Sequence, residues 1–130
     1  MRRSLTLWVP IVLLCACAAP GGATLQQAQS ACASGASHTE IEDGGTVVRV
    51  LGSRTSQAGT HEGFLVRIAG SSIRIEDNTD ITGYIPLQAG ERITFRGQYE
   101  CDDGVVHWTH HDPSMRHPAG YIHAGDRTYS

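Results

Sequence analysis

Residues 64–76 read Phe-Leu-Val-Arg-Ile-Ala-Gly-Ser-Ser-Ile-Arg-Ile-Glu, and this stretch decides the fold. Apolar and polar side chains alternate on either side of Gly70-Ser71, which is typical of two half-buried strands joined by a two-residue turn. The turn sets the register of the hairpin. The predicted cross-strand pairs are Ile68 with Ile73 and Val66 with Ile75 on the buried face, and Arg67 with Arg74 on the outer face.

Further short strands with turn residues between them surround this hairpin. The segment 46–51 is rich in β-branched residues, and residues 87–97 give a turn and then a strand with Ile93 and Phe95 inward. Another strand is predicted over 105–111, with Trp108 in the core, and 121–123 with 127–129 resembles a closing hairpin. We therefore predict an all-β fold: a small OB-like antiparallel barrel of five to seven short strands with a C-terminal hairpin.

The N-terminus is typical of an export signal, since Arg2 and Arg3 precede an apolar run that small residues close. The run is short for a membrane anchor, which would need about 20 apolar residues. Residues 1–16 are predicted as a signal peptide, 17–37 as a flexible tether with one helical turn through Leu25 to Ala31, and 38–130 as the β domain. Cleavage before Cys17 would leave a thiol for lipidation and give a periplasmic lipoprotein tethered to a membrane; cleavage by ordinary signal peptidase at Ala16-Cys17-Ala18 is the alternative.

Four cysteines occur in the chain, and the predicted signal accounts for two of them. Cys15 is removed with the signal and Cys17 is lipidated, which leaves Cys32 and Cys101 as a pair for an oxidising compartment. A disulfide between them would close a loop of about 70 residues and contribute roughly 4 kcal/mol in the chain-entropy model. Two unrelated free thiols are the alternative.

The net charge of the chain argues against nucleic acids as partners. Without Arg2 and Arg3 the chain keeps eight basic residues against 13 acidic ones, a net charge of −5 with neutral histidines. General nucleic-acid binding normally shows a basic footprint, so we do not expect it. The acidic run 76–80 lacks the spacing of a calcium loop and is interpreted as a solvated loop.

From about residue 38 to the C-terminus the chain resembles the bacterial domain-of-unknown-function family 3465. The resemblance rests on Gly45 to Val48, Arg96 to Glu100, His107 to Pro113, Arg116-His117 and Tyr121 to Tyr129. It implies no established reaction and carries over no functional residue. Cys101 stands where the family pattern has an aromatic residue, so a disulfide to Cys32 would be particular to this chain.

Residues 107–117, His-Trp-Thr-His-His-Asp-Pro-Ser-Met-Arg-His, hold four of the seven histidines. Such side chains bind metals, exchange protons near neutral pH and bind anions. On a strand, residues two apart are about 6.6 Å apart and can share a ligand, whereas residues four apart cannot. A transition-metal site would use His110, Asp112, His117 and His123. A purely structural cluster, with histidines satisfied by carbonyls or carboxylates, is the alternative.

The leading functional hypothesis is a binding module for a small anionic or saccharide-phosphate ligand, or for an envelope protein. Like charges facing each other on a sheet are unfavourable unless something lies between them, and an anion could; a salt bridge to Glu76 is the alternative. The candidate ligand-binding residues are His107, Arg67, Arg74 and His117. The competing hypothesis is a hydrolase such as a phosphodiesterase, with His110 or His111 as general base, Arg116 stabilising developing charge, and His117 or a metal assisting. The cofactor stays open, with a divalent transition metal as the candidate.

Overall fold

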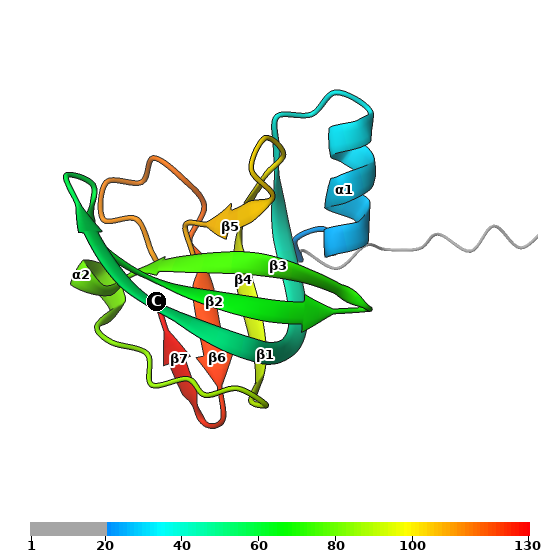
Figure 1. Ribbon diagram of the computed structural model, residues 1–130. Coiled ribbons are helices and arrows are strands. Elements are labelled where there is room, and N and C mark those ends of the chain that lie inside the picture. Colours follow the sequence, from blue (N-terminus) through cyan, green and yellow to red (C-terminus); the bar gives the residue numbers. More distant parts are fainter. Residues whose placement is uncertain (1–20) are drawn as a thin grey trace, which may run out of the picture.

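Figure 1 shows the protein as a computed structural model, which describes residues 21–130. The predicted signal peptide and the predicted lipidation site Cys17 lie outside these residues. The elements in chain order are α1 (Leu25–Ala33), β1 (His38–Ser56), β2 (Gly59–Ile68), β3 (Ser71–Asn78), α2 (Thr79–Thr82), β4 (Arg92–Glu100), β5 (Val105–His107), β6 (Tyr121–Ala124) and β7 (Arg127–Tyr129).

Five strands close into a barrel in the order β1-β2-β3-β5-β4, and the long strand β1 supplies the seam. Its first half pairs with β4 from His38 to Thr46, and its second half pairs with β2 from Thr46 to Ser56. Gly45 lies at the crossover, where a Cβ atom would meet the carbonyl oxygen of Arg67 at 2.5 Å. This closed order is the strand order of an OB-like barrel, with the β6–β7 hairpin added beside β4.

One pairing differs from the predicted antiparallel barrel. Strand β5 runs parallel to β3, through Arg74 with Val105 and Ile75 with Val106, while all other named strand pairs are antiparallel. The chain crosses from β3 through α2 to β4 before it turns back into β5. The chain therefore reverses its direction twice between β3 and β5, so the two strands run parallel.

The β2–β3 hairpin forms, but its register differs from the predicted one. Its two turn residues are Ala69 and Gly70, with φ values of 44° and 89°, so Ile68 pairs with Ser71. Positive φ at both central residues is characteristic of the turn type that fits the twist of a hairpin. The predicted pairs were wrong: Val66 faces Ile73, Phe64 faces Ile75, Arg74 faces Leu65 and Arg67 faces Ser72.

Most of the barrel interior is apolar, and the strand alternation that predicted it is confirmed. The inward side chains of β2, β3 and β4 are almost fully buried, and side chains of β1, β6 and the loop before β4 pack against them. The largest members of this core are Phe64, Phe95, Ile41, Ile75, Ile85 and Ile122.

The folded unit begins before residue 38: the helical turn expected within the tether is the start of helix α1, which packs on the barrel, so residues 25–33 are not a flexible tether. Helix α1 starts with a capping box between Thr24 and Gln27, and it buries Leu25 and Ala28 against the barrel. Two apolar positions three residues apart and a good cap are enough for a short helix when a core receives them. None of the helices in residues 21–130 has the length and apolarity to cross a membrane.

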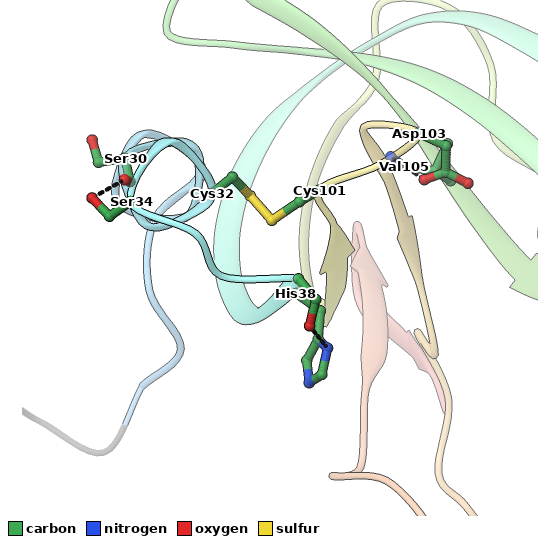
Figure 2. The surroundings of a disulfide bond; sticks show 8 residues. Ser30, Cys32, Ser34, His38, Cys101, Asp103 and Val105 are labelled. Carbon is green, nitrogen blue, oxygen red and sulfur yellow. Dashed lines mark hydrogen bonds between the residues drawn. A yellow bond between two sulfur atoms is a disulfide. The ribbon is translucent and has the colours of Figure 1, made fainter.

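A disulfide joins the end of α1 to the β4–β5 turn and confirms the predicted pairing of Cys32 with Cys101. Figure 2 shows the bond between the helix and the turn, with Asp103 and Val105 on the far side of the turn. The two Cα atoms lie 5.5 Å apart, within the usual range for a disulfide. The backbone N–H of Cys101 also donates to the carbonyl of Ser37 at 3.0 Å. The turn is therefore fixed covalently beside the start of β1.

Candidate functional site: the Trp108 groove

Strand β5 ends at His107, and at Trp108 the backbone turns into the left-handed region with φ 59°. A non-glycine residue in this region is uncommon, and such backbone strain recurs at functional sites. The turn reverses the alternation, so Trp108 is 41% exposed while Thr109 and His110 are buried. The prediction of a strand through residue 111 with Trp108 in the core was therefore wrong.

Two histidine rings pack against the indole of Trp108 and fix it in place. The centroid of His117 lies 4.4 Å away with the ring planes inclined by 36°, and that of His110 lies 6.1 Å away at 66°. Each Nδ1 contacts a carbonyl oxygen, His110 that of His111 at 2.7 Å and His117 that of Pro118 at 2.8 Å. A carbonyl can only accept, so both Nδ1 atoms carry hydrogen.

Asp112 holds the loop that carries His117. Its Oδ1 accepts from the backbone N–H of Ser114 at 2.7 Å, and its Oδ2 accepts from the N–H groups of Arg116 and His117. Desolvation acts to raise the pKa of Asp112, but these three donors and the nearby His117 ring outweigh it and leave the pKa below its ordinary value. Gly120 closes the loop tightly, since a Cβ atom there would meet the carbonyl oxygen of Trp108 at 2.0 Å.

A groove of about 510 Å³ opens beside Trp108, between the end of the β1–β2 hairpin and strand β5. A smaller pocket of about 50 Å³ adjoins it and shares His61, Glu76, His107 and Trp108. We call the two together the Trp108 groove. Its remaining lining residues are Arg54, Ser56, Ala58, Asn78, Glu100 and His110.

Glu76 is the charged centre of the Trp108 groove. Its Oε1 lies 3.6 Å from Nη2 of Arg54 and 3.3 Å from Nε of Arg74. Its Oε2 lies 3.5 Å from Nδ1 of His107, whose Nε2 is 3.9 Å from Asp103 in the β4–β5 turn. The salt bridge considered as the alternative for Arg74 is thus present.

Behind this surface, inside the barrel, lie two acids that the sequence analysis missed. Glu62 and Asp77 are direct partners across β2 and β3, and they are 1% and 0% exposed. Asp77 accepts from the hydroxyls of Thr109, at 2.7 Å, and Thr82, and Glu62 accepts from the N–H of Ile85 at 2.7 Å. Burial raises the pKa of both carboxyl groups.

The acidic run 76–80 is therefore not a solvated loop, because Glu76, Asp77 and Asn78 belong to β3. Alternation along a strand that closes a barrel sends every second residue inward, whatever its polarity. The inward position of Asp77, two residues after Ile75, was the signal that could have found it.

The structure gathers part of the predicted ligand-binding set. His107 lines the Trp108 groove, Arg74 lies at its edge on Glu76, and His117 supports Trp108 from the side. Arg67 is not with them: it is exposed near the β2–β3 turn, opposite Ser72.

The structure brings together only part of the predicted metal set: the ring centroids of His110 and His117 lie 5.3 Å apart, and Nε2 of His117 lies 3.9 Å from Oδ2 of Asp112. His123 lies apart from them in the β6–β7 hairpin, where its Nδ1 is 2.9 Å from Oγ1 of Thr128. The carboxylate oxygens of Asp112 already accept hydrogen bonds from backbone N–H groups. Across residues 21–130 no three His, Cys, Asp or Glu side chains form a group that could hold a metal ion. Of the catalytic candidates, His110 lines the small pocket, whereas His111 is exposed and the Arg116 side chain is 78% exposed.

The chain matches the sequence model of the family described as "Protein of unknown function (DUF3465)" over residues 10–130, and it belongs to that family. This confirms the resemblance noted from the motifs. No curated protein and no solved structure gives a significant match.

Proposed function

We propose that this DUF3465 protein is a binding module and that its ligand occupies the Trp108 groove. The observation that carries the proposal is the conformation of Trp108, an indole held half-exposed on a left-handed backbone at the wall of a groove. Such an arrangement strains the backbone and leaves part of the indole exposed, and strained residues of this kind cluster at functional sites. The groove also lies where OB-fold barrels bind ligands, on strands 2 and 3 and the loops that flank them.

The ligand must be polar on one side. Trp108 supplies an apolar wall, while His61, Glu76 and His107 supply hydrogen-bonding groups on the floor. Ligand sites generally combine apolar lining with a few fixed polar groups, and volumes of roughly 300–1,000 Å³ suit small ligands.

The binding hypothesis has more support than the hydrolase hypothesis. A hydrolase needs a general base and a charge-stabilising group around one reacting atom. The predicted base and the predicted charge-stabilising group do not surround one such atom. His110 lines the small pocket, whereas the side chain of Arg116 extends into solvent.

The test is a ligand screen by NMR on the full chain, with sugars, sugar phosphates, nucleotides, amino acids and dicarboxylates. We expect hits to shift the indole N–H of Trp108 and amides of the groove, and we expect Trp108→Ala to abolish those shifts. Tyr84→Ala is the matched control, since Tyr84 is 67% exposed and does not line the groove. Turnover of a bound phosphodiester would instead favour the hydrolase, and shifts scattered away from the groove would reject the proposal.

We also propose that the protein is exported and lipidated on Cys17, which would place the groove at a membrane surface facing the periplasm. The signal-like N-terminus supports this, and so does the disulfide, which persists in oxidising compartments. Labelling with a radioactive fatty acid in a bacterial host should mark the wild-type chain and not Cys17→Ser. A labelled Cys17→Ser chain, or an unlabelled wild type released as a soluble product, would contradict lipidation.

A further inference from the structure

Resting on the proposed function, we infer that the ligand of the Trp108 groove is a neutral oligosaccharide. The inference depends on two features of the groove: a fixed aromatic wall and a charge-balanced floor. Each feature is also present in other kinds of site, but together they fit the faces of a sugar chain.

The aromatic wall suits a ring that has an apolar face. The indole of Trp108 cannot turn freely, because His117 packs 4.4 Å from it and His110 lies against its edge. A preorganised aromatic group loses little side-chain entropy on binding. The C–H face of a pyranose ring is flat and apolar, so it can stack on such a surface while its hydroxyl groups point away.

The floor of the groove offers charged hydrogen-bonding groups without a free net charge. Both arginines at this site, Arg54 and Arg74, approach Glu76 within 3.6 Å. Glu100 is a further lining carboxylate. The charges of the two arginines and the two carboxylates cancel, so an anion would have to displace Glu76 from its arginines. Neutral hydroxyl groups can instead donate to the carboxylates and accept from the arginines at once.

Charge also separates an oligosaccharide from a nucleic acid. OB-fold barrels bind either class on this face. The described residues keep eight arginines against 13 acids, and a single strand of nucleic acid is held through its phosphates by a positively charged groove. The acidic chain and the balanced floor favour the uncharged ligand.

The test uses isothermal titration of the full chain with cellohexaose, maltohexaose and chitohexaose as neutral probes, and with trigalacturonate and glucose 6-phosphate as acidic probes. We expect at least one neutral hexasaccharide to bind saturably and both acidic probes to bind at least roughly tenfold more weakly. Trp108→Ala should weaken the neutral ligand by roughly tenfold or more, as truncation of a central aromatic contact does. Trp108→Phe should retain part of the affinity.

Glu76→Gln sharpens the test because it reverses the expected preference. Without the carboxylate, Arg54 and Arg74 become available to anions, so trigalacturonate should bind more tightly and the neutral hexasaccharide more weakly. Binding of acidic probes alone by the wild type, or of none of the neutral hexasaccharides, would overturn the inference. If the NMR screen still places other compounds in the groove, the binding module stands with a different ligand; if no compound reaches the groove, both proposals fail.

Discussion

Glu76 and Asp77 are neighbours on one strand, yet they lie in opposite environments. Glu76 faces outward and has Arg54, Arg74 and His107 within 3.6 Å. Asp77 faces inward, fully buried, and its hydrogen-bond partners are two threonine hydroxyls. The same chemical group is thus neutralised by cations on one face of the sheet and desolvated on the other. The comparison teaches that on this sheet the direction of a side chain, more than its type, decides what the group can do.

The largest effect should come from removing the inward acid. Asp77→Ala leaves the buried hydroxyls of Thr82 and Thr109 without their acceptor and opens a cavity, so we expect a loss of about 3 kcal/mol in the free energy of unfolding. Urea unfolding of both proteins with the disulfide intact measures this difference in the free energy of unfolding. Asp102→Ala, at an exposed turn position, is the control and should change the free energy by less than about 0.5 kcal/mol. Equal effects at the two positions would mean that Asp77 is not structural.

Glu62→Gln removes a charge from the inward pair but keeps the shape of the side chain. It should change the free energy of unfolding by less than Asp77→Ala does, and in the opposite direction. Burial raises the pKa of Glu62 above its ordinary value of 4.5, so the folded state holds that proton more tightly than the unfolded state. This contribution to stability is complete below pH 4.5 and is lost as the pH rises through the raised pKa. Glu62→Gln keeps an acceptor for the N–H of Ile85, so we expect a gain of about 1 kcal/mol at pH 8.

Unfolding curves between pH 4 and pH 9 test the sign. The wild type should lose part of its stability across this range, and Glu62→Gln should lose less. Glu91→Gln provides the comparison at an exposed carboxylate. Identical pH profiles for the wild type and Glu62→Gln would show that the pair is not desolvated as described.

The outward acid should matter least for stability. Arg54 is 73% exposed in its side chain, and ion pairs at such positions usually contribute 0 to about 1 kcal/mol. We expect Glu76→Gln to lower the free energy of unfolding by less than about 1 kcal/mol, with little dependence on the inward pair. Thermal unfolding at low and high salt measures this. A loss as large as that of Asp77→Ala would remove the contrast between the two faces.

Much of the fold could be predicted because alternation is a strong constraint in a barrel. Ile93 and Phe95 point inward as expected, and the β6–β7 hairpin forms around Gly125. The register of β2 and β3 could not be predicted, because it depends on which two residues accept positive φ, and Ala69 accepts it although alanine seldom does.

The site was less accessible to sequence reasoning. The sequence located the histidine-rich segment, but Trp108 looks like a core residue until its left-handed backbone turns it outward. A run of acidic residues resembles a solvated loop, so Asp77 was missed. Only the alternation that continues after Ile75 distinguishes a strand with an inward acid from such a loop. Arg67 and Arg74 looked like a pair because the turn was assigned one residue too late.

The disulfide has a mechanical consequence. Cys32 and Cys101 are 69 positions apart, and the bond bypasses the five-stranded ring almost completely. A stretching force applied between the two chain termini would run through the sulfur atoms and leave β1 to β4 outside the loaded path. If the N-terminus is attached to a membrane, drag on the rest of the molecule would strain the C-terminal hairpin and the loop that carries Trp108 before it could peel open the barrel.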